Sequence, residues 1–431
     1  MIRTRGFSNY EETGLKWLGP VPSAWGIVPL WTLYTRGKST NVPDEELLSV
    51  YRDHGVVLKS SRADNFNKPS DDLSPYQLVK PGDMVINKMK AWQGSVAISR
   101  HRGIVSPAYF VYERHHSMDD RYLHYLLRSE RYIAGYLSLS KGIRINQWDL
   151  DPTYHSRMPV LVPSIQEQRN IVNILDRETA QIDVLITKQE RLIELLAEKR
   201  QAIITRAVTK GLDPTAPTKP SGIPWLGDIP SRWEAIPLKW LSQFTTGITP
   251  STANEDNFPE EETSYPWIRP EDLEESGRPT EASKFLSAEA WNGCRPVRAD
   301  SVLLCCIGGT LGKVGLIRRS AVTNQQITAI ETEMVGAYLF ATLGAARQEI
   351  KAMSVGNTLP ILNTSRLGML SVPVPPAQEQ LKIAEYVRVK SLEIDLLSSK
   401  CHSAIRLLRE RRSALISAAV TGKIDAREGV A

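Results

Sequence analysis

The 431-residue sequence lacks the features that mark secreted, membrane-bound and disulfide-stabilised proteins. Its four cysteines, Cys294, Cys305, Cys306 and Cys401, form no C-x-x-C pair and no scaffold pattern, so we expect reduced thiols. No run of eighteen apolar residues is present that could cross a membrane. The N-terminal stretch MIRTRGFSNYEETG has no apolar core of a signal peptide. These absences predict a cytoplasmic chain without a membrane partner.

The sequence also lacks a complete catalytic or metal-binding motif. GGTLGKVG at 308–315 resembles a phosphate-binding loop, but Ile307 replaces the first glycine and Val314 replaces the magnesium-binding hydroxyl. We expect its glycines to form a turn or hairpin. DPTY at 151–154 lacks the second proline of the adenine-holding loop of amino-methyltransferases, and we interpret it as a connector between a domain and a helix. No H-E-x-x-H, Cys/His metal spacing or G-x-S-x-G elbow occurs, which favours a binding protein over an enzyme.

An internal repeat is the main positive feature of the chain. GLKWLGPVPSAWGIVPL at 14–30 returns as GIPWLGDIPSRWEAIPL at 222–238. Solenoid repeats have much shorter periods, roughly 20–50 residues, so the wide separation predicts two copies of one whole module. We expect the repeated tryptophans to be packing anchors at the base of each module; they are Trp17, Trp25, Trp225 and Trp233.

The C-terminal part of each copy matches most closely and predicts a long helix. Residues 163–213 and 375–425 both begin with Pro and Gln-Glu-Gln and end in Ala-Val-Thr and then Asp. Apolar residues recur at a spacing of three and four, Ser164 and Glu167 form a capping box, and Pro376 suits a first turn. A helix of about 45 residues would be roughly 65–70 Å long, so its apolar stripe needs a partner.

We therefore predict that the two helices pack together as an antiparallel coiled-coil pair. The alternative is two separate helices, each folded onto its own module. The N-terminal part of each copy has short alternating apolar runs bounded by Gly, Pro, Asn and Asp, which is typical of strands and turns. Aligning the copies pairs residues 80–98 with 297–317, and VSPAYF with TNQQIT downstream.

The predicted fold class is α+β, with an internal pseudo-two-fold repeat. Two diverged mixed α/β domains are joined and separated by the two long helices. The expected boundaries are 1–163 for the first domain, 164–211 for the first helix, 212–375 for a linker and the second domain, and 376–431 for the second helix and the C-terminal tail.

These motifs, duplicated in this order, resemble the DNA specificity subunit of type I restriction-modification systems. The resemblance rests on the W-L-G-x-x-P-x-x-W opening, the P-x-x-Q-E-Q helix start, the A-V-T helix end and the Asn324–Gln325 pair. It extends from Trp17 to about Asp425. One departure is that the first copy has Val105-Ser106-Pro107 where the second has Thr323-Asn324-Gln325.

The resemblance implies a non-catalytic subunit whose two target-recognition domains each read one half of a bipartite, asymmetric sequence in double-stranded DNA. It also implies that the helices space the half-sites and dock two modification (methyltransferase) subunits, with restriction (motor-nuclease) subunits completing the complex. Methyl transfer and cleavage would then belong to those partners, which would bind S-adenosylmethionine, ATP and Mg. We expect no cofactor and no metal in this chain.

Polar residues in turn-rich, basic stretches are the candidates for DNA contact. Arg and Lys pair well with guanine, and Asn and Gln with adenine, whereas contacts to phosphate only set position. The candidates in the first domain are Lys88, Lys90, Trp92, Gln93, Arg144, Asn146 and Gln147. Those in the second domain are Arg269, Lys313, Asn324, Gln325 and Asn357.

Two other classes of function stay open on the sequence. One is a coiled-coil adaptor whose variable domains bind proteins, and the other is an enzyme with unrecognised motifs. Steep salt dependence of DNA binding would favour the recognition subunit over the adaptor, because neutralised phosphates release counterions. DNA modified or cut by the isolated chain with S-adenosylmethionine or a divalent metal would favour the enzyme.

Overall fold

The computed structural model describes residues 6–52, 54–61, 69–141, 148–276, 278–356 and 358–425. It divides into two compact units. Unit 1 comprises Met1–Lys188 and Ala404–Ala431, and unit 2 comprises Gln189–Ser403. Each unit therefore contains one of the two domains, the first half of one long helix and the second half of the other.

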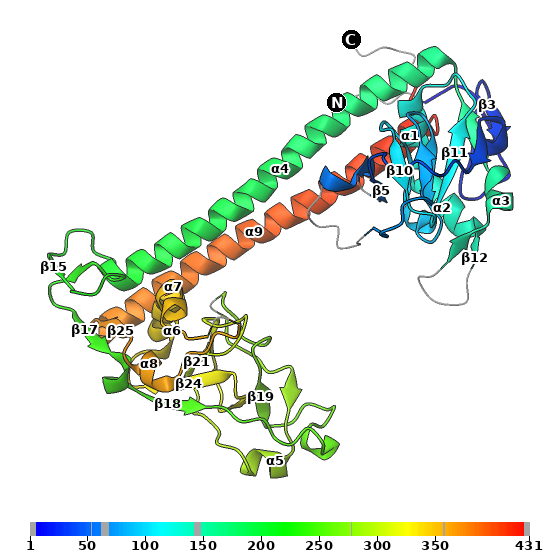
Figure 1. The fold of residues 1–431 in the computed structure, drawn as a ribbon. Helices are drawn as coiled ribbons and strands as arrows, with labels where there is room; N and C mark the ends of the chain where they lie inside the picture. The colour runs from blue at the N-terminus through cyan, green and yellow to red at the C-terminus, as the bar shows by residue number, and fades with distance from the viewer. Residues whose placement is uncertain are drawn as a thin grey trace. The chain divides into compact units, whose positions relative to one another are not determined.

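Unit 1 builds its domain from short strands and helices (Figure 1). Its strands are β1 (Tyr10–Glu11), β2 (Val21–Pro22), β3 (Gly26–Pro29), β4 (Tyr34–Gly37), β5 (Leu48–Tyr51), β6 (Gly55–Leu58), β7 (Gln77–Val79), β8 (Met84–Asn87), β9 (Val96–Ile98), β10 (Gly103–Val105), β11 (Tyr109–Arg114), β12 (Ser140–Lys141), β13 (Asp149–Leu150) and β14 (Pro159–Val162). Its short helices are η1 (Leu30–Thr32), η2 (Lys59–Ser61), η3 (Ala91–Gln93), α1 (Asp120–Leu127), α2 (Glu130–Leu139) and α3 (Pro152–Ser156).

Unit 2 repeats much of this order. Its strands are β15 (Thr218–Pro220), β16 (Asp228–Pro230), β17 (Glu234–Pro237), β18 (Ser242–Thr246), β19 (Pro266–Ile268), β20 (Lys284–Phe285), β21 (Val302–Cys305), β22 (Val314–Leu316), β23 (Val322–Thr323), β24 (Ile327–Thr332) and β25 (Ser371–Val374). Its short helices are η4 (Leu238–Trp240), η5 (Glu255–Asn257), α5 (Ala288–Asn292), α6 (Gly336–Ala345), α7 (Arg347–Ala352) and α8 (Thr364–Gly368).

The two long helices are α4 (Ile165–Lys210) and α9 (Ala377–Val420). The capping box of α4 is present, because the Ser164 hydroxyl accepts from the Glu167 backbone at 3.3 Å and the Glu167 carboxylate accepts from the Ser164 backbone at 3.1 Å. Within unit 2, Leu196 of α4 shares one apolar cluster with Ile394 and Cys401 of α9. The second half of α4 thus packs on the first half of α9, which confirms the antiparallel pair and excludes two separate helices.

The domains share a four-stranded antiparallel sheet with the same strand order. The order is β4-β11-β8-β9 in unit 1 and β18-β24-β21-β22 in unit 2. Met84 pairs with Ile98 across β8 and β9, and Val302 pairs with Leu316 across β21 and β22. Met84 and Val302 thus hold the same register position, as do Ile98 and Leu316. The segments 80–98 and 297–317 are therefore equivalent, but the end of the alignment is displaced by one residue, because Ile98 matches Leu316 and not Ile317.

The last glutamine of each Gln-Glu-Gln motif is a buried structural linker. The Gln168 amide donates to the carbonyl oxygen of Pro163 and accepts from the backbone of Asp119, both at 2.8 Å. In the second copy, the Gln380 amide donates to the carbonyl oxygen of Pro375 at 2.8 Å and accepts from the backbone of Val335 at 2.9 Å. Asp119 and Val335 are the N-cap residues of α1 and α6. Each glutamine therefore ties the start of a long helix to a helix of its own domain.

Aromatic anchors also repeat. Tyr122 and Tyr338 are fully buried, and their hydroxyls donate to carbonyl oxygens of the last domain strand at 3.3 and 3.0 Å. Trp25 and Trp233 are buried as well, and Nε1 of Trp233 donates to the Glu379 carboxylate at 3.0 Å. The expectation that these two tryptophans act as packing anchors is confirmed.

Candidate nucleic-acid interface

Four of the expected DNA-contacting residues of unit 2 come together where β19 and β23 end. These strands pair in parallel, so their carboxyl ends lie at the same edge. The Asn324 backbone donates to Ile268 at 3.0 Å, and Lys313 Nζ donates to the Pro270 carbonyl at 3.1 Å. Arg269, Lys313, Asn324 and Gln325 thus lie on neighbouring loops. Asn357 falls outside the described residues.

Arg269 is held by its own domain. Its Nη2 donates to the Ser283 hydroxyl at 2.8 Å, and Nη1 lies 2.7 Å from a carboxylate oxygen of Glu271. The Asp272 carboxylate accepts from the Arg269 backbone at 2.8 Å and also binds the Ser283 hydroxyl. These contacts use one N–H group on each terminal nitrogen and fix the orientation of the Arg269 guanidinium, whose remaining N–H groups could still donate to a base.

Asn324 and Gln325 differ sharply in accessibility. Asn324 is 8% exposed, and both ends of its amide bind Gln326 at 3.1 Å. This geometry favours a structural role in the turn over the base contact expected for it. Gln325 is exposed, and its side-chain oxygen accepts from the Thr249 hydroxyl. Thr249 is a polar member of this edge that the sequence analysis did not single out.

The expected residues of unit 1 that the structure describes also form one group, around the loop between β8 and β9. Lys90 and Gln93 are exposed, and Lys88 lies 3.7 Å from the Asp149 carboxylate. Trp92 donates from Nε1 to the Met89 carbonyl at 3.1 Å, and its ring centroid lies 4.8 Å from that of Trp148. Arg144, Asn146 and Gln147 fall outside the described residues.

Lys313 lies in the loop between β21 and β22, which is equivalent to the loop between β8 and β9 in unit 1, and the two loops have diverged. Gly94 and Gly312 both have left-handed backbones, with φ of 90° and 86°, and both lie in the loop that joins the equivalent strands. Only glycine adopts this conformation without strain. Lys88 corresponds to Cys306, whose pKa is raised to about 11 by burial, so this thiol stays neutral near pH 7. The same backbone frame thus carries different side chains.

The motifs set aside in the sequence have structural roles. GGTLGKVG forms the turn between β21 and β22, with no helix after it, as expected for a hairpin. The Asp151 carboxylate of DPTY caps α3 by accepting from the backbones of Thr153 and Tyr154.

His155 is buried and does not mark a metal site. Burial lowers the pKa of His155 to about 3, and its Nδ1 lies 3.1 Å from the Tyr112 hydroxyl. Among the described residues, no cluster of three or more His, Cys, Asp or Glu side chains could hold a metal.

Among the helices that the structure describes, none is both long enough and apolar enough to cross a bilayer.

Comparison with known proteins gives a consistent result. Residues 230–398 match the family model described as the type I restriction modification DNA specificity domain. The chain is 24% identical to the type I restriction enzyme MjaVIII specificity subunit of Methanocaldococcus jannaschii, over 96% of each chain. It is 25% identical to the StySPI specificity subunit of Salmonella potsdam, over 48% of this chain and 47% of that one.

Solved structures show the same fold. A chain from a study of complex assembly and conformational transition of the type I R-M system superposes with a TM-score of 0.72 at 14% identity, covering 94% of this chain and 99% of that one. The HsdS subunit of Thermoanaerobacter tengcongensis gives a TM-score of 0.51 at 15% identity, covering 94% and 98%. The family model, the relatives and the fold all support a DNA specificity subunit of a type I restriction-modification system.

Proposed function

We propose that this specificity subunit recognises a bipartite, asymmetric sequence in double-stranded DNA, with the domain of unit 1 reading one half and the domain of unit 2 the other. The observation that carries the proposal is that the two domains share the same sheet but carry different side chains on its loops. The sheets match in strand order and register, whereas the loops at their edge carry Lys88, Lys90 and Gln93 in one unit and Lys313 and Gln325 in the other. Different side chains on one frame suit two different half-sites.

The same chain would scaffold two copies of one modification subunit. Three exposed apolar residues of α4 have exposed apolar counterparts at the repeat-equivalent positions of α9. The pairs are Val184 with Leu396, Leu185 with Leu397, and Leu195 with Leu407. Isolated exposed apolar residues are common, but exposure at three equivalent positions supports two equivalent docking surfaces. Two identical partners would fit such a pseudo-two-fold arrangement.

In this proposal the chain itself performs no chemistry. The modification subunits would bind S-adenosylmethionine and transfer the methyl group, and the motor-nuclease subunits would use ATP and Mg. The described residues of this chain would contribute sequence reading, spacing and docking. Adenine methylation directed by the assembled complex is therefore the most direct readout of its DNA recognition.

Exchange of one domain tests the proposal. Residues 30–160 are replaced by the matching segment of another specificity subunit, and methylated adenines are mapped across the genome of cells that express the complete system. We expect one half of the methylated motif to change and the other to persist. A matched exchange of the unit 2 domain should alter the other half only. If either exchange altered both halves, separate reading would be wrong.

Salt dependence separates this proposal from the adaptor. DNA binding by the complex assembled with its modification subunits should weaken steeply as salt rises, because Lys and Arg release counterions from phosphates. Unaltered affinity over that range, or equal affinity for unrelated sequences, would favour an adaptor whose domains bind proteins.

A further inference from the structure

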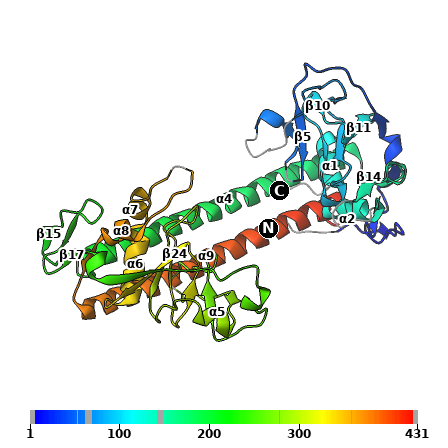
Figure 2. The same ribbon diagram turned by 60° about the horizontal axis from the view of Figure 1, so that its bottom comes forward.

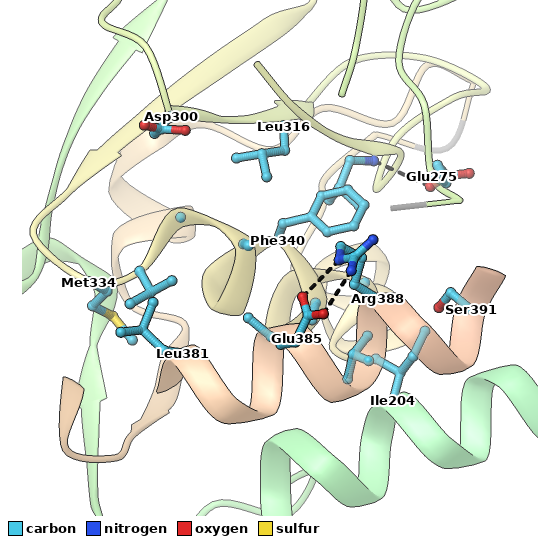
Figure 3. A pocket seen from close by; sticks show the side chains of 18 of the residues that line it. Ile204, Glu275, Asp300, Leu316, Met334, Phe340, Leu381, Glu385, Arg388 and Ser391 are labelled. Carbon is cyan, nitrogen blue, oxygen red and sulfur yellow. Dashed lines mark hydrogen bonds and ion pairs between the residues drawn. The ribbon is translucent and has the colours of Figure 1, made fainter. Parts of the chain in front are cut away.

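Unit 2 contains a cavity of about 820 Å³ between its domain and the helix pair. Its walls come from α4, α6, α7 and α9 and from the β22 strand. In Figure 3 the Phe340 ring and the Arg388–Glu385 pair face the same space, with Ile204 of α4 beneath them. Figures 1 and 2 both place α6 against the long helices in this unit. The volume falls in the range of small-molecule sites, roughly 300–1,000 Å³.

The repeat explains why this space is open. Helices α1 and α6 are equivalent, because Tyr122 and Tyr338 make the same buried hydrogen bond from the same helical position. Besides Phe340, the face that α6 turns to the cavity carries Ala337, Ala341 and Gly344. The equivalent positions of α1 carry Arg121, Tyr125 and Arg128. Three large side chains of one copy are thus replaced by two methyl groups and a glycine in the other.

Unit 1 shows what chemistry fits the equivalent space. The Tyr125 hydroxyl donates to the Asp176 carboxylate of α4 at 2.7 Å, and Arg121 Nη2 lies 3.1 Å from the same carboxylate. An aromatic ring with a polar end therefore bridges the domain and the long helix there. Its partner on the helix is an anion.

The charge at that helix position is inverted in unit 2. Asp176 of α4 corresponds to Arg388 of α9 when the two helices are aligned at their Gln-Glu-Gln motifs. Arg388 is half-exposed and binds Glu385 on its own helix through Nε and Nη2, both at 2.7 Å. Leu316, Phe340 and Leu381 form an apolar wall beside it, and the carboxylates of Glu275 and Asp300, which also line the cavity, are each paired with an arginine of the lining. Glu385 engages only Nε and Nη2, so Nη1 of Arg388 can still donate to an anion beside an apolar space of aromatic size.

We propose that this cavity binds a small aromatic molecule that carries an anionic group. The ring would occupy the volume that Tyr125 fills in unit 1, next to Phe340, where aromatic pairs are favourable. The anion would meet Arg388, since guanidinium pairs strongly with carboxylate, sulfonate or phosphate oxygens. This ligand stands apart from DNA recognition, and its binding would stabilise the contact between α6 and the helix pair.

Fluorescence titration of the full-length chain with anilinonaphthalene sulfonate, an aromatic anion, tests the proposal. We expect saturable binding that Ala341→Tyr weakens at least about tenfold, because the introduced phenol reproduces Tyr125 and fills the cavity. Arg388→Gln, which leaves the volume intact and alters an exposed side chain, should also weaken binding. Neutral N-phenylnaphthylamine should bind more weakly than the sulfonate.

The matched control is Ala288→Tyr, an identical change at an exposed position of α5 in the same unit, which should leave binding unchanged. Thermal unfolding of each variant checks that it is folded. Unchanged affinity in both Ala341→Tyr and Arg388→Gln would overturn the proposal. So would equal affinity for the neutral probe, or a chain that binds neither probe. If Ala341→Tyr instead blocked docking of a modification subunit while probe binding persisted, the cavity would belong to a protein contact.

Discussion

Arg200 of α4 forms an ion pair with Asp395 of α9, and the repeat supplies a second copy of this pair. Its counterpart is Asp183 of α4 with Arg412 of α9, whose Nε lies 3.1 Å from the carboxylate. The roles are exchanged, so that each helix supplies one arginine and one aspartate. Because unit 2 contains the first pair and unit 1 the second, each unit clamps its two helices by the same contact.

The two clamps should differ in strength. The Arg200–Asp395 side chains are 24% and 27% exposed, and Arg200 also donates to the Ser391 carbonyl at 3.2 Å. The Arg412–Asp183 side chains are 39% and 55% exposed. A double-mutant cycle of alanine substitutions, read by chemical unfolding, should give a coupling free energy of about 1–2 kcal/mol for the first pair and below about 1 kcal/mol for the second. Equal couplings would contradict the role of burial.

Gln168 and Gln380 should be far more sensitive to substitution than other helix glutamines. Gln168→Leu leaves the Asp119 backbone donor and the Pro163 carbonyl without their partner, at a cost of roughly 2–4 kcal/mol in the free energy of unfolding. Gln380→Leu should cost a similar amount. Gln166→Leu is the control, since Gln166 is exposed and, among the described residues, binds Asn170 alone, and it should change stability by less than about 0.5 kcal/mol. A tolerated Gln168→Leu would refute the linker role.

The repeated apolar residues predict the stoichiometry of the complex. Leu185→Arg on α4 should remove one of two modification subunits, and Leu397→Arg on α9 should remove the other, because a buried unpaired charge is costly at an interface. The double variant should bind none. Native mass spectrometry of the purified complexes measures this directly. Leu137→Arg, at an exposed position of α2, is the control and should retain both copies; loss of both from one single variant would contradict two independent surfaces.

Helix length should set the unread gap between the half-sites. Four residues inserted after Lys188 lengthen α4 by about 6 Å and should lengthen the gap in the methylated motif while both half-sites stay the same. The same insertion after Thr215, in the loop that follows α4, should leave the motif unaltered. Methylome sequencing distinguishes these outcomes, and an unaltered gap in the first variant would remove the spacer role.

Mild acid should destabilise unit 1 selectively. Burial lowers the pKa of His124 and of His155 to about 3, whereas the unfolded value is about 6.5. The unfolded chain therefore binds more protons between these values, and stability is lost as pH falls below about 6, by about 1.4 kcal/mol per pH unit for each histidine. Hydrogen exchange followed by peptide should show protection falling in unit 1 between pH 6 and pH 4. Unit 2 contains only His402, which is exposed, and should change less.

Local sequence patterns were enough to predict the long helices and the equivalent strands of the two copies. The 3-4 spacing and the capping residues predict both ends of α4 and the start of α9 to within one residue, because helix formation depends on neighbours along the chain. The repeat then places equivalent strands in equivalent register, as Met84–Ile98 and Val302–Leu316 demonstrate. The antiparallel pairing is predicted because a stripe that long needs a partner, and the cluster of Leu196 with Ile394 and Cys401 confirms it over two separate helices.

The tertiary structure alone decided which polar and small residues are available to a ligand. Asn324 carries an amide of the kind that can read a base, yet both ends of this amide are hydrogen-bonded to Gln326. Gln168 belongs to a visible motif, but its partner Asp119 lies 49 residues earlier. Nothing in the helix sequence distinguishes Ala341, and only the fold brings it together with Arg388 in the lining of one cavity. Accessibility depends on contacts between residues distant in sequence, and no local pattern encodes those contacts.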